Sequence, residues 1–253
     1  MNQSVRKALT ILDLFIDNEE LSLHEITKKA KLSKPTTYRL LSTLETAGLL
    51  YKKKDGPHDS RYGLGLKLLE LGELVADRLE LRKIALPYME NLAKEVNEVV
   101  HLVIINQQEA TYIEKVNSRR ALSLHTNIGR STPLYVGSGP KMLLAFLSNE
   151  EQDIIIGNKP LKTLRYEPIE KRKLKEELRN IKENHYAISV GEQDADTTGV
   201  SFPIFNHEHK LVAALAVSGL STRFIGEKLE VIKQKGKQSA LEISNQLGYK
   251  SNV

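Results

Sequence analysis

The chain has 253 residues, of which 40% are hydrophobic and 27% charged, enough to build one large domain or two modest ones. Its formal net charge is +5, and the lack of cysteine excludes disulfides, thiolate catalysis and thiolate metal sites. No segment approaches the ~20 apolar residues that cross a bilayer, and the first residues lack the apolar core and cleavage site of a signal peptide. These features predict a cytoplasmic protein that does not bind membranes.

The first fifty residues predict a three-helix unit. Residues 4–17 have the apolar spacing of an amphipathic helix, and residues 21–50 read as a short helix, a tight turn, a second helix and the start of a strand. We expect Ser33 to cap the second helix with its hydroxyl group and Pro35 to lie in the first turn. The apolar stripe of the helix at residues 4–17 is predicted to contain Val5, Ala8, Ile11, Leu12 and Phe15. The stripe of the helix that follows Ser33 is predicted to contain Tyr38, Leu40, Leu41 and Leu44.

The polar side of the second helix points to DNA. Residues 28–39 contain five cations and no acid, which favours phosphate neutralisation. A helix-turn-helix presents this end of its second helix to base edges in the major groove. A basic run is more often a solvated helical face, but here it coincides with the turn and the capped helix. The polar side of this helix carries Lys34, Thr36, Thr37, Arg39 and Ser42. Thr36, Thr37 and Arg39 are expected to read bases, although Arg39 could instead hold a phosphate.

Two short strands at residues 49–53 and 61–64, separated by Asp-Gly and Gly-Pro turn signals, predict a hairpin wing. Lys52, Lys53 and Arg61 would add phosphate or minor-groove contacts. Residues 1–63 are therefore expected to be a winged helix-turn-helix domain. The leucine-rich residues 64–80 predict a linker helix and a dimer surface, because DNA-binding domains usually bind two half-sites as dimers. Pro87 is expected to start or kink the next helical part.

Residues 81–253 predict a second domain of the α+β class. Strands are expected within 99–116, 121–127, 186–190, 199–205 and 210–220, and helices over most of 150–184 and over 228–247. The segment 165–183 is expected to be highly solvated. An antiparallel sheet with flanking helices accounts for this order.

One segment of this domain suggests a site for an acid. Ser138 and Gly139 open a predicted helix whose free N–H groups and dipole can hold a carboxylate, to which Lys141 could add charge and Ser218 a hydroxyl group. Alternatively, Ser138 only caps the helix and Gly139 only permits the turn. His125 could point into this pocket or could be a core or rim histidine.

Other polar clusters give no catalytic or metal-binding pattern. Glu192, Asp194 and Asp196 match no metal-ligand spacing and are expected to be a solvated loop. His101 is expected to be a core or rim residue. We find no nucleophile–base constellation and no phosphate-binding glycine loop. The sequence therefore predicts no catalytic residue, no cofactor and no metal.

The ordered motifs of the chain resemble those of the IclR family of bacterial transcription regulators over some 220 residues. The matching runs are SVRKALTILDLF, LSLHEITKKAKLSKPTTYRLLSTLETAGLL, RYGLGLKLLELG, GRSTPLY, SGPKMLLAFL, and GVSFPIF followed by AVSG and Arg223. The resemblance implies a winged helix-turn-helix, a linker helix and a GAF-like effector domain, in dimers or dimers of dimers. The resemblance implies that Ser33, Lys34, Thr36, Thr37 and Arg39 lie where the recognition helix meets DNA. The effector-binding residues expected on this basis are Leu122, His125, Ser138, Gly139, Lys141, Glu192 and Ser218. Ala216 departs from many members, which have a small polar residue there.

These observations predict a ligand-responsive, sequence-specific DNA-binding regulator rather than an enzyme. The expected partners are an operator in double-stranded DNA, a small organic acid and further copies of the chain in a homodimer or tetramer. Repression of a catabolic operon is the leading hypothesis, and activation by the same architecture is the alternative. An enzyme acting on a small acid and a constitutive architectural DNA-binding protein are the competing classes.

Overall fold

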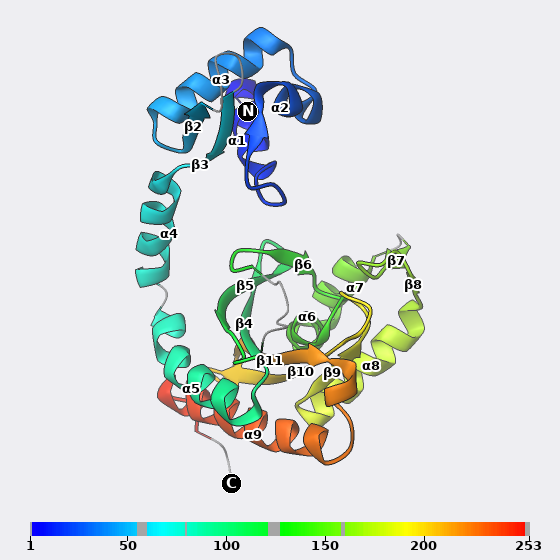
Figure 1. Ribbon diagram of the computed structural model, residues 1–253. Coiled ribbons are helices and arrows are strands. Elements are labelled where there is room, and N and C mark those ends of the chain that lie inside the picture. The colour runs from blue at the N-terminus through cyan, green and yellow to red at the C-terminus, as the bar shows by residue number, and fades with distance from the viewer. Residues whose placement is uncertain (1, 55–59, 79, 121–126, 158–159, 251–253) are drawn as a thin grey trace. The chain divides into compact units, whose positions relative to one another are not determined.

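The computed structural model describes residues 2–54, 60–78, 80–120, 127–157 and 160–250. The chain divides into two compact units, Met1–Leu79 and Glu80–Val253 (Figure 1). None of the helices in these ranges has the length and apolarity needed to cross a membrane.

The N-terminal unit packs three helices against a small antiparallel sheet with the strand order β1-β3-β2. Its elements are α1 (Gln3–Asp13), β1 (Leu21–Ser22), α2 (Leu23–Ala30), α3 (Lys34–Thr46), β2 (Leu50–Lys54) and β3 (Ser60–Leu64). Ile11, Ile26 and Leu41 form the centre of its core. The helices and the hairpin were predicted, whereas β1 was missed, because two residues are too short to show a period.

Local details correct several expectations in this unit. Helix α1 ends at Asp13, and Val5 is 55% exposed at its start. Ser33 is the N-cap residue of α3, but its hydroxyl group pairs with the Thr36 hydroxyl at 2.9 Å rather than with a described backbone N–H. Tyr38 was expected in the apolar stripe and is 56% exposed. The buried residues of α3 are Thr37, Leu41 and Leu44, so Leu41 and Leu44 were predicted correctly and Thr37 takes the place expected for Tyr38.

Two helices follow the hairpin, α4 (Leu66–Arg78) and α5 (Glu80–Val96). Pro87 lies inside α5, which begins at Glu80, so of the two expected roles, a helix start and a kink, the helix start is wrong. Ala85, Met89 and Leu92 are buried on both sides of Pro87. Burial of these side chains offsets the helical hydrogen bond that proline cannot donate.

The C-terminal unit contains an antiparallel sheet, in which six described strands have the order β6-β5-β4-β11-β10-β9. Helices α5 and α9 cover one face of this sheet, while α6 lies on the other face and is covered in turn by α8 (Figure 1). This arrangement confirms the predicted α+β class. The described elements of this unit after α5 have the following bounds: β4 (Val99–Asn106), β5 (Glu109–Val116), β6 (Ser131–Pro133), α6 (Ser138–Ala145), α7 (Asn149–Ile156), β7 (Leu161–Lys162), β8 (Pro168–Ile169), α8 (Lys171–Asn184), β9 (Ala187–Val190), β10 (Thr197–Phe205), β11 (Leu211–Leu220), a 3-10 turn (Ser221–Arg223) and α9 (Gly226–Gln246).

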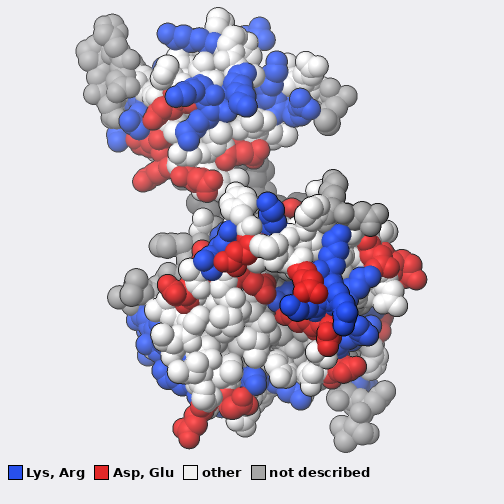
Figure 2. Space-filling model, turned by 90° about the vertical axis from the view of Figure 1, so that its right-hand side faces the viewer, with Lys and Arg blue, Asp and Glu red and all other residues white. Residues whose placement is uncertain are grey.

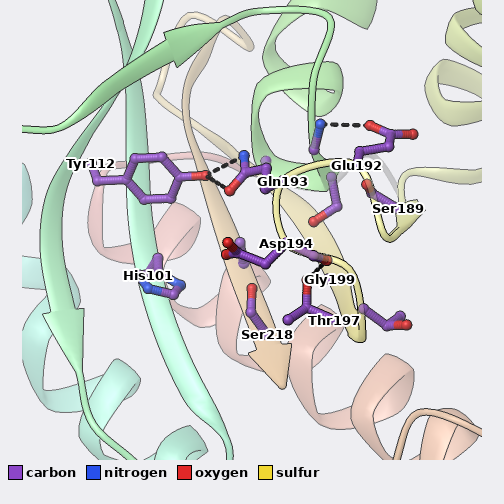
Figure 3. A pocket seen from close by; sticks show the side chains of 14 residues that line it. His101, Tyr112, Ser189, Glu192, Gln193, Asp194, Thr197, Gly199 and Ser218 are labelled. Carbon is purple, nitrogen blue, oxygen red and sulfur yellow. Dashed lines mark hydrogen bonds between the residues drawn. The ribbon is translucent and has the colours of Figure 1, made fainter. Parts of the chain in front are cut away.

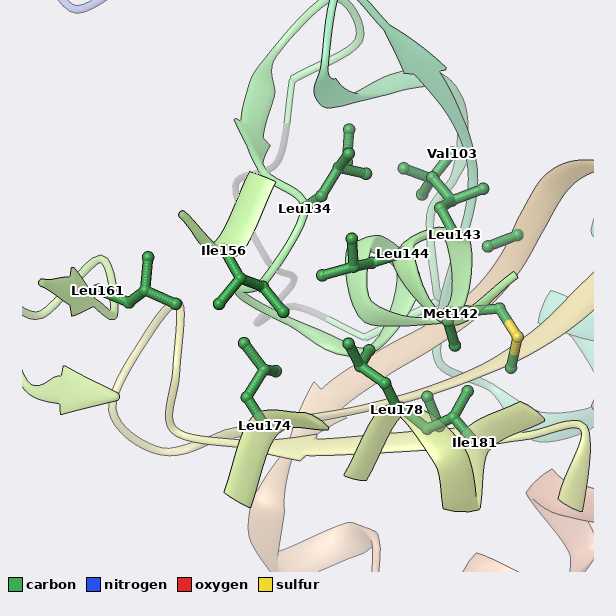
Figure 4. Packing of buried hydrophobic residues seen from close by; sticks show 14 of the residues in the cluster. Val103, Leu134, Met142, Leu143, Leu144, Ile156, Leu161, Leu174, Leu178 and Ile181 are labelled. Carbon is green, nitrogen blue, oxygen red and sulfur yellow. The ribbon is translucent and has the colours of Figure 1, made fainter. Parts of the chain in front are cut away.

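The segment 150–184 differs from the predicted charged helix. Helix α7 ends at Ile156, where the C-cap residue Gly157 has a φ of +46°, and the short β7–β8 hairpin precedes α8. Leu174, Leu178 and Ile181 recur at helical spacing on α8 and are buried against α6 (Figure 4). One face of α8 therefore belongs to the core, which corrects the expectation that residues 165–183 are highly solvated. The sequence concealed this face because its apolar residues occur only at every third or fourth position. Most of the strand expected over 121–127 lies outside the described residues.

Candidate DNA-binding face and effector pocket

The start of α3 presents polar and cationic side chains to solvent. Ser33, Lys34 and Arg39 are exposed, and Thr36 is half-buried. Thr37 is fully buried, and its hydroxyl group donates to the Ser33 carbonyl oxygen at 3.1 Å. Thr37 is therefore a core residue that cannot reach a base edge, which corrects one of the predicted contacts.

A groove lies beside α3, between α2 and the hairpin. It brings together two of the predicted cations, Lys34 from α3 and Lys52 from β2. The Lys52 ammonium lies 5.8 Å from the centre of the Tyr62 ring. The other lining residues are Ser22, Leu23, His24, Thr27, Tyr38 and Ser60. Sequence reasoning missed His24 and Tyr38 as groove residues, although Tyr38 is one helical turn after Lys34 and so shares its face.

Lys53 and Arg61 lie on another side of the hairpin. They are opposite one another in the β2–β3 ladder and line a hollow with the acidic Glu19 and Glu20. The Lys53 ammonium is 3.6 Å from the Glu20 carboxylate. Lys53 and Arg61 are not among the residues that line the groove of Lys34 and Lys52, and the acids beside them oppose phosphate binding. Figure 2 shows that Lys and Arg gather on one face of the N-terminal unit, with acids along its edge.

The C-terminal unit has a pocket where the start of α6 meets the sheet and the loop 191–196 (Figure 3). Two glycines permit this close approach. Gly137 has a φ of +99°, and a Cβ atom at Gly199 would lie 2.7 Å from the Ser138 hydroxyl oxygen. The pocket is lined by His101, Tyr112, Gly137, Ser138, Gly139, Ser189, Glu192, Gln193, Asp194, Thr197, Thr198, Gly199, Ala216 and Ser218.

Four predicted effector residues belong to this lining: Ser138, Gly139, Glu192 and Ser218. The N-cap residue of α6 is Gly137 and Ser138 is the first helical residue, so Ser138 is not merely a cap. Leu122 and His125 lie outside the described residues. The free space is about 40 Å³, roughly the volume of one water molecule. The pocket is thus formed but almost filled by its own side chains.

Lys141 is placed differently from the expectation. It lies in α6, is 2% exposed, and its ammonium group contacts the carboxylates of Glu177 and Glu192, the latter at 2.6 Å. The second oxygen of Glu192 accepts a hydrogen bond from the Gly137 backbone N–H at 2.7 Å. The positive charge is therefore already paired, and Glu192 rather than Lys141 faces the pocket. A buried ammonium group requires such partners because an unpaired one would be strongly destabilising.

His101 is the pocket residue that sequence reasoning assigned to core or rim. It projects from β4, meets the Tyr112 ring edge-on at 5.4 Å between centroids, and lies opposite Ala216 in the β4–β11 ladder. Neither of its ring nitrogens has a hydrogen-bond partner among the described residues. Burial, with a smaller effect of Lys115, lowers the pKa of His101 to about 3. Its imidazole is thus neutral near pH 7 and carries one donor and one acceptor.

Both units match known proteins. Residues 4–54 match the IclR helix-turn-helix domain, and residues 73–245 match the C-terminal domain of the bacterial transcriptional regulator IclR. The chain is 37% identical over 249 residues to the HTH-type transcriptional regulator KipR of Bacillus subtilis, covering 98% of both chains. It is similar to the crystal structure of Thermotoga maritima IclR, with 33% identity, a TM-score of 0.79, and coverage of 97% of this chain and 99% of that one. An IclR homologue of Microbacterium hydrocarbonoxydans, crystallised with 4-hydroxybenzoate, shares the fold at 23% identity, with a TM-score of 0.82 and coverage of 97% and 99%.

Proposed function

Because the chain belongs to the IclR family of bacterial transcriptional regulators, as its motifs predicted, we propose that it is a repressor controlled by a small organic acid. It is a DNA-binding transcriptional regulator, and its relatives are regulators rather than enzymes. We further propose residues 1–63 as the DNA-reading domain, 64–80 as the linker and 81–253 as the effector domain. Occupation of an operator by such a protein blocks transcription without requiring contact with polymerase.

The observation that carries the proposal is the exposed start of α3 beside a cationic groove. Thr36 and Arg39 would read base edges, since this part of a helix-turn-helix enters the major groove. Ser33, Lys34 and Lys52 would hold phosphates and fix the register of the protein on the duplex. Lys53 and Arg61 would contribute less, because Glu20 lies beside them.

Exposed leucines on α4 support a homodimer. Leu66 is 83% and Leu69 60% exposed, and Leu71 and Leu74 are also exposed. Large apolar side chains that a single chain leaves exposed can be buried against a second copy, which would bring a second reading head to the other half-site of an operator. A dimer of such dimers would give the tetramer.

The pocket beside α6 supports an acid as effector. It combines a helix N-terminus, the hydroxyl groups of Ser138 and Ser218, and an uncharged imidazole. The carboxylate ligand of the Microbacterium homologue is consistent with this chemistry. Control of DNA binding requires that the acid bind more tightly to one of two arrangements of the protein.

Fluorescence anisotropy of the purified protein on a duplex from its own upstream region tests the proposal. A scrambled duplex, two salt concentrations and a panel of small carboxylates provide the comparison. We expect tight binding to the native duplex alone, weakened by one acid, and less transcript from that promoter in vitro. Equal, salt-sensitive binding to both duplexes would contradict specific recognition of that region, and more transcript would make the protein an activator.

A further inference from the structure

The carboxylate of Glu192 occupies the position in the pocket that is best suited to an anion. One of its oxygens accepts the Gly137 backbone N–H at the start of α6, and the other accepts from the Lys141 ammonium group. A helix N-terminus and a buried cation together favour a carboxylate at this point. The group that now occupies it comes from the loop 191–196 and is only partly buried, with its side chain 22% exposed.

A second feature of the pocket is a buried imidazole without a hydrogen-bond partner in the described part of the chain. His101 is buried, lines the same pocket, and has no hydrogen-bond partner on either ring nitrogen among the residues described. Its neighbour across the ladder, Ala216, offers only a methyl group. Buried polar groups without partners destabilise a protein, so an occupant that brings an oxygen to His101 gains affinity there. Figure 3 shows His101 on the sheet and Glu192 and Gln193 on the loop at the other side of the pocket.

The loop also fills the space that a ligand would need. The Gln193 amide donates to the Tyr112 hydroxyl at 2.9 Å and to the Val136 carbonyl oxygen at 3.1 Å. The space that remains, about 40 Å³, is far below the ~300–1,000 Å³ of ordinary ligand pockets. Entry of an effector therefore requires residues 191–196 to move.

We propose that Glu192 is an internal competitor of the effector. The effector's carboxylate replaces that of Glu192 at Gly137 and Lys141, a hydroxyl or carbonyl oxygen of the effector pairs with His101, and the displaced loop changes the arrangement of the C-terminal unit. This inference rests on the proposed function and makes it specific. Lys141 keeps Glu177 as a partner throughout the exchange, so its charge is never left unpaired in the core.

Chemical rescue tests this proposal without knowledge of the natural effector. The variant Glu192→Ala opens the anion position, and acetate is the probe because it is the carboxylate that the substitution removes. We expect acetate to raise the melting temperature of Glu192→Ala in a saturable way, with an affinity about tenfold or more above that of the wild type, because the competitor is gone. Acetamide, which has the same shape without the charge, and chloride at equal ionic strength should have no effect.

Three outcomes of the acetate titration would overturn the proposal. If Glu192 were itself a ligand contact, Glu192→Ala would bind acetate more weakly than the wild type; equal affinities, or no binding by either protein, would also overturn the proposal. The matched control is Glu176→Ala, which removes an exposed acid of α8 and should respond to acetate like the wild type. If Glu192→Ala does not fold, Glu192→Gln keeps the shape, removes the charge, and should still bind acetate more tightly than the wild type.

The role of His101 is tested by comparing the affinities of acids with and without a hydroxyl group. In the Glu192→Ala background we would compare two pairs of acids that differ by one hydroxyl group, acetate with glycolate and benzoate with 4-hydroxybenzoate. We expect the hydroxyl group to improve binding about tenfold in at least one pair, and His101→Phe to abolish that gain while leaving the unsubstituted acid unaffected. A gain that survives His101→Phe, or no gain in either pair, would remove His101 from the proposal.

Operator binding separates failure of this inference from failure of the proposed function. Wild type and Glu192→Ala are assayed on the native and scrambled duplexes in parallel with the acetate titration. Specific DNA binding without the tenfold acetate effect would refute the competitor and leave the regulator. Loss of duplex discrimination by the wild type would instead refute the specific repressor, whatever acetate does to the melting temperature.

Discussion

Replacement of His101 by phenylalanine should remove a strong pH dependence from the stability of the protein. The pKa of this imidazole falls from 6.5 in the unfolded chain to about 3 in the folded one, because burial disfavours its charged form. Between these values the unfolded chain binds more protons, so this stability is present above pH 6.5 and is lost as the pH falls towards 3. From about pH 7.5 to about pH 5 the loss amounts to ~2 kcal/mol. Phenylalanine cannot titrate and keeps a ring against Tyr112.

The measurement is the free energy of unfolding from urea denaturation, followed by far-ultraviolet circular dichroism at both pH values. Other groups also titrate in this range, so the quantity compared is the loss between the two pH values in the wild type minus that in His101→Phe. We expect a difference of ~2 kcal/mol. His207→Phe, at an exposed histidine, is the control and should lose as much stability as the wild type. An equal loss in His101→Phe and in the wild type would show that His101 is not held neutral by burial.

Four further substitutions test the DNA-binding face, an ion pair and the dimer surface. Arg39→Ala should weaken operator binding by ~1–3 kcal/mol and relax specificity at one base position, whereas Lys34→Ala should weaken binding to all duplexes and reduce the salt slope by about 1; anisotropy on single-base operator variants distinguishes them. Arg223→Ala removes the bidentate partner of the buried Glu98 but leaves Arg120 at 3.5 Å from its carboxylate. It should cost about 2 kcal/mol in urea denaturation, and an unchanged midpoint would contradict this. Leu69→Lys should shift the protein to monomers in sedimentation equilibrium and weaken operator binding; an unchanged dimer would place the interface elsewhere.

The N-terminal unit could be predicted well because its signals are local. Each turn, each helical spacing and the strand pair is encoded within a short stretch of sequence, and the structure has each of them. The error lies at one position of the buried stripe of α3. Neighbouring helical residues point about 100° apart, and threonine and tyrosine are both partly polar, so composition alone could not decide which of Thr37 and Tyr38 faces the core. Burial of Thr37 decides it.

The effector pocket could be predicted only in part, because most of its contacts are distant in sequence. The start of α6 has a local signal in Ser138 and Gly139, and the structure places both in the lining. Lys141, by contrast, meets acids that lie 36 and 51 residues later in the chain, and no periodicity indicates such pairs. The unpartnered state of His101 depends on Tyr112 and Ala216 as neighbours, which the strand pairing determines.

The charges around α6 allow the Glu192 carboxylate to be exchanged for the carboxylate of a ligand. Lys141 is a single buried cation with two carboxylate partners, Glu177 and Glu192, so one of these acids is not needed to neutralise it. Replacement of the Glu192 carboxylate by that of a monoanionic ligand leaves the charge next to α6 unchanged, and the cation itself then discriminates little between acids. Selectivity must come from the rest of the ligand, through groups such as the His101 imidazole and the Ser218 hydroxyl. Variation at these positions, rather than at Lys141, should therefore change which acid a regulator of this architecture detects.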